Sequence, residues 1–238
     1  MASILLVDDA AALAELFSRA IADALGHRVE FVTALADVGD ALKQHPVFDL
    51  ALVDMSFPQE HGTGLWALAE IHRGSPTTRL AIITQGDEWV AEILRDCLEL
   101  LPIATVISKT APLDYQLAAI RQVLAEGTAP PDPAIRPLLP RAGSNRRTPQ
   151  QFEALVQHAG HAKLWRALMA ETDVSYKALA VATGLKLNTL KNYRAQIVPE
   201  LVNHGLVDPS LRDMRLFANR CRPFLDPYID ERLGVSTA

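Results

Sequence analysis

Residues 49–54 read Asp-Leu-Ala-Leu-Val-Asp, an apolar run that ends on a carboxylate. Three other short apolar runs in the first half of the chain are also followed by polar side chains. The runs at residues 4–7, 80–83 and 103–108 are followed by Asp8 and Asp9, by Thr84, and by Lys109. Because each run has the length and composition of a buried strand, we expect all of these polar residues, and Asp54, at strand ends.

The first half alternates between such runs and segments with helical periodicity. Strands are expected at about residues 3–7, 28–32, 49–53, 79–84 and 103–107, and helices at about residues 10–25, 34–45, 63–73, 87–100 and 112–126. Nearly continuous Ile, Leu and Val are typical of strands buried on both faces, as in a parallel sheet. Five strand–helix repeats predict a doubly wound α/β domain with a five-stranded parallel sheet. Ligands of such sheets bind beyond the carboxyl ends of the strands.

The polar residues at these ends favour chemistry on a phosphoryl group. Crowded carboxylates repel one another, and Mg2+ is a hard cation that binds their oxygens while keeping several waters. Such an ion would neutralise charge on a phosphoryl group, while Lys109 and Thr84 bind its other oxygens. Asp54 is the candidate nucleophile, because a carboxylate that attacks phosphorus yields an acyl phosphate. The alternative for any one position is an ordinary solvated residue after a buried strand.

The segment from Asp54 to Gly62 resembles the Asp-x-x-x-Pro-x-x-x-Gly segment of receiver domains in bacterial two-component response regulators. The resemblance covers residues 1–127 and implies a flavodoxin-like fold. It also implies that a sensor histidine kinase phosphorylates Asp54. The implied Mg2+ ligands are Asp8 (through water), Asp9, Asp54 and Ser56 (by its carbonyl oxygen), and the implied phosphoryl-binding residues are Thr84 and Lys109.

Three residues depart from the receiver pattern. Gln85 stands where the family has a small residue, Val106 where it often has Tyr or Phe, and Thr110 where it usually has a cis proline. A cis peptide bond before a residue other than proline costs about 2.5–4 kcal/mol, so we expect the loop after Lys109 to be rearranged. These departures leave open how Asp54 would communicate with the rest of the chain.

The middle of the chain, residues 128–147, is expected to be a linker. Residues 127–149 contain six of the fifteen prolines, which favours a semi-rigid connection over packed structure. Charge changes across this region: residues 1–128 hold 8 Lys and Arg against 18 Asp and Glu, whereas residues 146–238 hold 13 against 9. An acidic first half and a mildly basic second half predict two domains with different partners.

The output domain, residues 148–238, is expected to be all helical. Residues 175–197 predict two short helices joined by a turn that contains Gly184, and Pro199 is expected to stop or kink the second helix. The part from Gly184 to Arg194 is similar to the Gly-Leu-Ser-x-x-Thr-Val-Lys-x-His segment of LuxR/NarL-type helix-turn-helix domains. The resemblance implies double-stranded DNA as a partner, with candidate contacts at Lys186, Thr189, Lys191, Asn192, Arg194 and Ala195. The alternative is a helical bundle that dimerises or docks on a protein.

These features together predict a response regulator that acts as a DNA-binding transcriptional regulator. It is not expected to be an enzyme, since residues 146–238 contain no catalytic cluster. The alternative is a phosphorylation-controlled interaction module that does not bind DNA. A homodimer with DNA half-sites about 10 base pairs apart is the geometric expectation. Two distant cysteines, Cys97 and Cys221, and the lack of an apolar run of roughly 20 residues favour a cytoplasmic protein without membrane contact.

Overall fold

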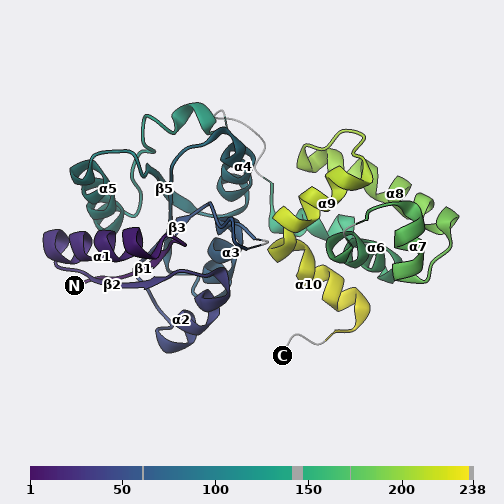
Figure 1. Ribbon diagram of the computed structural model, residues 1–238, viewed down its shortest axis with the longest axis horizontal. Helices are drawn as coiled ribbons and strands as arrows, with labels where there is room; N and C mark the ends of the chain where they lie inside the picture. Colours follow the sequence, from purple (N-terminus) through teal and green to yellow (C-terminus); the bar gives the residue numbers. More distant parts are fainter. Residues whose placement is uncertain (61, 141–146, 172, 236–238) are drawn as a thin grey trace. The chain divides into compact units, whose positions relative to one another are not determined.

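The computed structural model describes residues 1–60, 62–140, 147–171 and 173–235. Internal contacts divide the chain into two compact units, Met1–Ser144 and Asn145–Ala238 (Figure 1). Within the described ranges, no helix is both long enough and apolar enough to cross a membrane.

The first unit is built on a five-stranded parallel sheet with the strand order β2-β1-β3-β4-β5 (Figure 1). The strands are β1 (Ser3–Val7), β2 (Arg28–Val32), β3 (Leu50–Asp54), β4 (Arg79–Thr84) and β5 (Ile103–Ser108). The main helices are α1 (Ala11–Leu25), α2 (Val38–Gln44), α3 (Gly64–Gly74), α4 (Ala91–Leu100) and α5 (Leu113–Glu126). This arrangement confirms the predicted doubly wound fold with a five-stranded parallel sheet.

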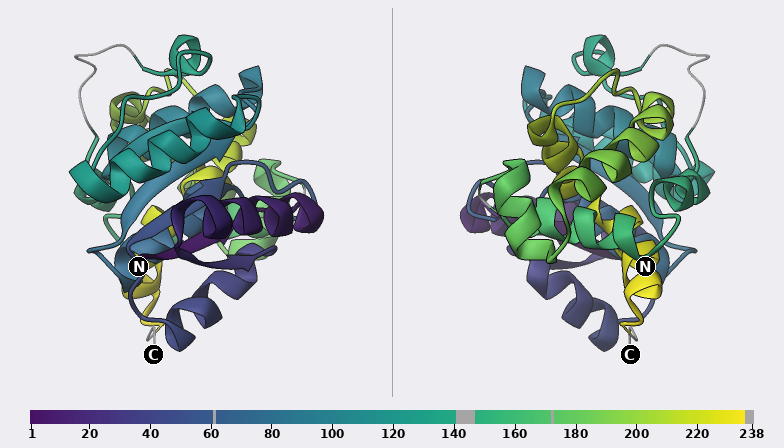
Figure 2. Two further views of the ribbon diagram at one scale, coloured as in Figure 1. Left: turned by 90° about the vertical axis from the view of Figure 1, so that its left-hand side faces the viewer. Right: turned by 90° about the vertical axis from the view of Figure 1, so that its right-hand side faces the viewer.

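The centre of the sheet is formed by strands that are buried on both faces. Every residue of β3 is buried, as its continuous apolar sequence predicted. Leu50 and Leu52 belong to the same core cluster as Ile21 of α1 and Ile120 of α5, because alternate side chains of a strand point to one face. Figure 2 shows α1 and α5 side by side on that face. The central strands therefore present their carboxyl ends from a rigid, fully packed support.

Residues 129–138, here called the outer-edge segment, pack along β5. Ala129 donates its backbone N–H to the carbonyl oxygen of Ala104 at 3.1 Å, and Asp132 donates to that of Val106 at 2.9 Å. An edge strand leaves a row of backbone polar groups unpaired, and these two hydrogen bonds satisfy part of that row.

The outer-edge segment differs from the linker expected over residues 128–147. Ile135 is only 1% exposed, and its side chain lies against Gly86 in the loop after β4. The prolines therefore do not keep this stretch out of the packed unit, since burial of Ile135 and edge-strand hydrogen bonding both stabilise it. Residues 141–146 of the expected linker lie outside the described part of the chain.

Replacing Ile135 with Ala is expected to lower the free energy of unfolding of the first unit by about 2–4 kcal/mol, because shortening a buried aliphatic side chain leaves a cavity. Val47→Ala is a suitable control, since Val47 is 64% exposed. Urea denaturation followed by circular dichroism measures both variants. A loss for Ile135→Ala no larger than that for Val47→Ala would show that the outer-edge segment contributes nothing to the stability of the unit.

The second unit is all helical, as predicted (Figure 1). Its described elements are two 3-10 helices (Pro149–Leu155 and Val202–His204) and the α-helices α6 (Ala159–Ala170), α7 (Tyr176–Thr183), α8 (Leu187–Leu201), α9 (Leu211–Arg220) and α10 (Arg222–Leu233). Trp165 of α6 is fully buried, and its indole N–H donates to the carbonyl oxygen of Leu155 at 2.9 Å. Pro199 does not stop α8, which was one of the two expected outcomes, because the helix continues to Leu201. Pro199 lies in the last turn, where its missing N–H removes a single hydrogen bond of the helix.

Candidate functional site

The carboxyl ends of β1, β3, β4 and β5 bring five polar residues to one edge of the sheet. Asp54 and Thr84 are the last residues of β3 and β4, Asp8 and Asp9 follow β1, and Lys109 follows β5. Parallel strands share one direction, so their carboxyl ends meet at the same edge. The structure thus gathers the residues that the strand-end pattern had singled out.

The ammonium of Lys109 bridges two of these carboxylates. Its Nζ lies 2.7 Å from Asp8 Oδ2 and 2.8 Å from Asp54 Oδ2. The other oxygen of Asp54, Oδ1, accepts the backbone N–H of Met55 at 2.7 Å. Because Asp54 is only 3% exposed, protein donors rather than water stabilise most of its charge.

Burial and the ion pairs act in opposite directions on the two ends of this bridge. Burial raises the pKa of Asp54 above its ordinary value, although the hydrogen bond and positive charge of Lys109 oppose that rise. Burial acts to lower the pKa of Lys109, but the hydrogen bonds and charges of Asp54 and Asp8 outweigh it and raise that pKa. Lys109 therefore stays charged, while negative charge remains crowded around it.

The crowded negative charge has the geometry of a cation site. Asp8, Asp9 and Asp54 each contribute one carboxylate oxygen, and these three oxygens all lie within 4.8 Å of one another. Ser56, the fourth expected ligand residue, lines the same pocket as Asp9 and Asp54. Oxygen donors alone suit a hard divalent cation better than a softer metal.

A pocket of 130 Å³ is lined by five of the predicted site residues, Asp9, Asp54, Ser56, Thr84 and Lys109. Besides the predicted site residues, it is lined by Ala10, Leu13, Pro58, Gln85, Asp87, Trp89 and Val90. Trp89 is 52% exposed, which is unusual for so large an aromatic side chain. Only the fold of the segment after β4 places Trp89 at the pocket.

The backbone beside Asp54 requires glycine at position 64. A Cβ atom on Gly64 would collide with the carbonyl oxygen of Asp54. Only a residue without a side chain lets the start of α3 approach the end of β3 so closely. The helix expected from about residue 63 begins at Gly64.

The loop between β5 and α5 is arranged without a cis peptide bond, since all peptide bonds between described residues are trans. Side chains hold it instead. Ser108 Oγ and Thr110 Oγ1 lie 2.7 Å apart, and the Gln116 amide donates to the carbonyl oxygens of Lys109 and Ala111 at 3.2 and 2.8 Å. Sequence reasoning did not identify Gln116, because an isolated glutamine in a helix carries no signal of its contacts.

The other two departures from the receiver pattern are Gln85, which follows Thr84 at the end of β4, and Val106, which pairs with Ile82 in the sheet. Gln85 is exposed and lines the pocket. Val106 is only 1% exposed, and the outer-edge segment bonds to its carbonyl oxygen through Asp132. A buried valine at position 106 offers no large side chain that could rotate between the sheet and solvent.

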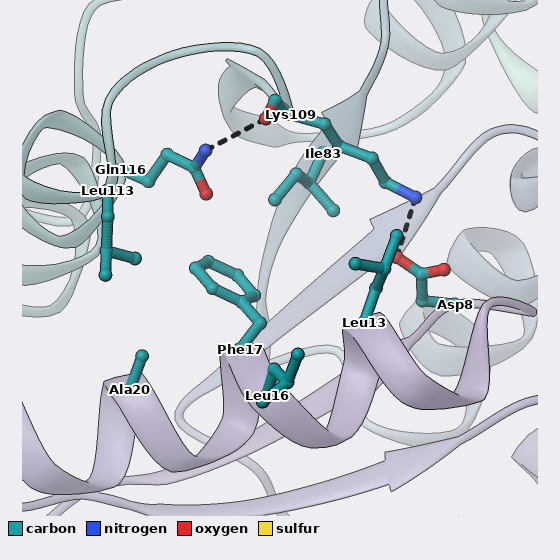
Figure 3. A pocket seen from close by; sticks show the side chains of 9 residues that line it. All are labelled: Asp8, Leu13, Leu16, Phe17, Ala20, Ile83, Lys109, Leu113 and Gln116. Carbon is teal, nitrogen blue, oxygen red and sulfur yellow. Dashed lines mark hydrogen bonds and ion pairs between the residues drawn. The ribbon is translucent and has the colours of Figure 1, made fainter.

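A second pocket of 280 Å³ lies beside Asp8 and Lys109, between α1 and α5 (Figure 3). Its other lining residues are Leu13, Leu16, Phe17, Ala20, Ile83, Leu113 and Gln116. Leu13, Leu16 and Leu113 are 57%, 63% and 46% exposed. The Asp54 site therefore adjoins an apolar surface that the sequence analysis did not identify.

The predicted helix-turn-helix segment forms two packed helices, α7 and α8. Ser175 caps α7 by accepting the backbone N–H of Ala178, and Gly184 has a φ of +68° in the turn. Leu179, Leu190 and Ile197 are buried between the helices and their neighbours, whereas Leu185 is only partly buried. The two expected helices and the turn at Gly184 are therefore present.

The six candidate DNA contacts fall into two groups. The exposed ones are Lys186, Lys191, Asn192 and Ala195, and the partly buried ones are Thr189 and Arg194. The Arg194 guanidinium donates to the carbonyl oxygen of Pro209 at 2.6 Å and lies 3.5 Å from Asp208. Arg194 is thus engaged within its own unit. Lys191 is exposed, and its ammonium lies over the ring of Tyr176, 5.8 Å from the ring centre.

Comparison with known proteins identifies the first unit. Residues 4–120 match the model of the response regulator receiver domain. The chain is similar to a CheY-like receiver domain protein from Methanospirillum hungatei (24% identity, TM-score 0.45, covering 53% of this chain and 95% of that one). It is also similar to a LuxR-family two-component response regulator from an Aurantimonas species (22%, TM-score 0.49, 58% and 94%). A LuxR-family DNA-binding response regulator from Silicibacter pomeroyi is similar as well (23%, TM-score 0.45, 56% and 98%). The search of curated proteins found no match.

Proposed function

Residues 4–120 are a response regulator receiver domain, and we propose that this domain accepts a phosphoryl group on Asp54 from a sensor histidine kinase. The observation that carries the proposal is the ammonium of Lys109, held 2.7 Å from Asp8 and 2.8 Å from Asp54. A buried carboxylate, an ammonium and the hydroxyl of Thr84 around one pocket can receive a phosphoryl group and bind its oxygens.

We also propose that Mg2+ is the cofactor of this site. Three carboxylates with oxygens within 4.8 Å of one another face a single ammonium, so their negative charge exceeds its positive charge. Asp9, Asp54 and the Ser56 carbonyl oxygen would hold the ion, with Asp8 acting through water. Bound there, Mg2+ would neutralise charge on the transferred phosphoryl group.

The transfer forms one bond and breaks one bond. An oxygen of the Asp54 carboxylate bonds to phosphorus while the bond from phosphorus to the donor imidazole nitrogen breaks, and the imidazole keeps the electron pair. Lys109 and Thr84 bind oxygens of the moving group. The product is an acyl phosphate on Asp54. The chain acts in this proposal as a stoichiometric acceptor and not as an enzyme.

A small phosphodonor tests this proposal without a cognate kinase. Acetyl phosphate with Mg2+ should label the protein at Asp54, and chelation of Mg2+ should abolish the labelling. Labelling can be followed by phosphate-affinity electrophoresis, and hydroxylamine should remove it because acyl phosphates are cleaved by this nucleophile. An unlabelled protein, or one labelled equally without Mg2+, contradicts the proposal.

The kinase must reach Asp54 past the surface around the two pockets. Leu13 lines both pockets, and Leu16 continues the apolar surface along α1. Exposed apolar side chains beside a site that a protein partner must enter are suited to contact that partner. We therefore assign this part of α1 to kinase docking.

Leu16→Arg should slow phosphoryl transfer from a kinase by on the order of tenfold. The substitution would place an unpaired positive charge in the proposed interface with the kinase. Its rate with acetyl phosphate should not change, since Leu16 does not line the pocket that holds Asp54. The control is Val47→Arg, also at an exposed apolar residue, which precedes β3 at the opposite end of the sheet. Transfer from a panel of purified sensor kinases measures the effect. Equal slowing with kinase and acetyl phosphate would contradict the assignment.

For the second unit, we propose binding to double-stranded DNA as a homodimer, which would make the protein a transcriptional regulator. Support comes from the packed α7–α8 pair and from the exposed side chains on α8. Lys191 and Asn192 can reach base edges in the major groove, and Lys186 can reach phosphate. Because a sensor kinase and DNA are the proposed partners, we propose that the protein acts in the cytoplasm.

One observation favours the second candidate function, a phosphorylation-controlled docking module for a protein. Arg194 bonds to Pro209 and Asp208, so this cation is less available for phosphate contacts. Capture of genomic DNA fragments by the purified protein separates the two functions. No capture with or without phosphorylation would favour the docking module.

A further inference from the structure

The loop between β5 and α5, residues 109–112, determines where the Lys109 side chain begins. The backbone N–H of Lys109 donates to the carbonyl oxygen of Thr84 at 2.8 Å, which ties the start of the loop to the sheet. The residues after Lys109 lie outside the sheet, so their carbonyl oxygens need hydrogen-bond donors other than the backbone N–H groups of a neighbouring strand.

Gln116, on the first turns of α5, supplies these donors. Its Nε2 lies 3.2 Å from the carbonyl oxygen of Lys109 and 2.8 Å from that of Ala111. Figure 3 shows the amide reaching from α5 to the backbone of Lys109, while the Lys109 side chain extends the other way to Asp8. A side-chain amide has two N–H donors, so two carbonyl bonds use its full donor capacity. Gln116 is only 7% exposed, which keeps water from competing for these carbonyl groups.

We propose that Gln116 is a positioning residue for phosphoryl acceptance, and that it acts by clamping the loop that aims Lys109 at the pocket. The inference rests on the proposed function of Asp54. Thr110 contributes a local hydrogen bond to Ser108, whereas the side chain of Gln116 connects the loop at Lys109 and Ala111 to α5.

The clamp matters because the ammonium must be placed accurately. Lys109 reaches from the loop into the site, and its side chain is 16% exposed. Misplacement of a reacting or charge-stabilising group by about 1 Å can cost on the order of a hundredfold in rate. The carboxylates of Asp8, Asp9 and Asp54 come from β1 and β3 instead, so their placement does not depend on Gln116.

Loss of the Gln116 amide should therefore weaken binding of a phosphoryl group, which depends on Lys109, but not binding of Mg2+, which depends on the carboxylates. A purely structural role would affect both kinds of binding. Gln116→Met keeps the length of the side chain and removes both N–H donors. Its affinity for beryllofluoride in saturating Mg2+ should fall by about ten- to a hundredfold. Its affinity for Mg2+ alone should be unchanged or higher, because the Mg2+ ligands remain in place. Isothermal titration measures Mg2+ binding, and fluorine NMR measures bound beryllofluoride.

The matched control is Gln122→Met on the same helix. Gln122 donates to Glu126 at the surface, at 3.0 Å, and to no other residue in the described part of the chain, so its loss should leave both affinities unchanged. Gln116→Glu, which has no N–H donor when ionised, replaces Gln116→Met should that variant fail to fold. Lys109→Ala provides the reference for complete loss of the ammonium.

Two results would overturn the inference. Wild-type beryllofluoride affinity in the Gln116 variants would show that the clamp does not position Lys109. Equal losses of Mg2+ and beryllofluoride affinity would show that Gln116 only supports the fold. If the wild-type protein itself binds no beryllofluoride, the proposed function of Asp54 fails and this inference fails with it.

Discussion

Asp54→Asn will abolish formation of the acyl phosphate. The amide has nearly the same shape as the carboxylate, but it lacks the anionic oxygen that attacks phosphorus. Removing the nucleophile of a coupled site costs rate factors of more than about 10³. Labelling with acetyl phosphate and Mg2+, read by phosphate-affinity electrophoresis, should therefore give no signal above background.

Asp49→Asn is the matched control for this loss. Asp49 immediately precedes β3, at the opposite end of that strand from Asp54, and its carboxylate accepts the backbone N–H of Ser3 at 2.8 Å. An asparagine there keeps an oxygen acceptor, so labelling should match that of the wild type. Labelling that persists in Asp54→Asn would place the acyl phosphate elsewhere, with Asp8 and Asp9 as the nearest carboxylates.

The double substitution Lys191→Ala with Asn192→Ala will weaken sequence-specific DNA binding by about 2–6 kcal/mol, because each good contact to a base contributes about 1–3 kcal/mol. Both side chains are exposed on α8, whereas the residues that pack this helix, Leu190 and Ile197, are fully buried. The fold should therefore be unaffected. Fluorescence anisotropy with a fragment selected from genomic DNA measures the change.

Lys163→Ala is the control for loss of charge alone. Lys163 is exposed on α6 and carries the same charge as Lys191. If it contacts phosphate, its loss should weaken binding to all sequences alike and reduce the salt dependence. Weakening that is equal for specific and random DNA in the double variant would show that α8 does not contact bases. Retained function without any DNA binding would support the protein-docking alternative.

The strands and helices of the receiver domain could be predicted almost completely, because the sequence patterns that indicate them lie within short segments. Short apolar runs produce buried strands, and the residue after each run is necessarily near a carboxyl end. Asp54 and Lys109 lie 55 positions apart, yet the parallel order of the strands brings them within 2.8 Å. The predicted strands and helices of this unit agree closely with the observed ones for the same reason.

The outer-edge segment and the DNA candidates were less predictable. Six prolines indicated a linker, but the burial of Ile135 and the unpaired edge of β5 outweigh that local preference. Arg194 matched the position of a DNA contact in the sequence, whereas its partners Pro209 and Asp208 follow from the path of the chain after α8. A pattern of residue types does not contain such long-range pairings.

The sequence by itself determined the parallel sheet and the polar residues at the ends of its strands, which are Asp8, Asp9, Asp54, Thr84 and Lys109. These depend on periodicity and on polarity next to buried runs, which are properties of neighbouring residues. Only the tertiary structure decided how Lys109 is aimed. The position of the Lys109 side chain depends on hydrogen bonds from Gln116 to the carbonyl oxygens of Lys109 and Ala111, at 3.2 and 2.8 Å. A contact of this kind between a helix and a loop leaves no periodic pattern in the sequence.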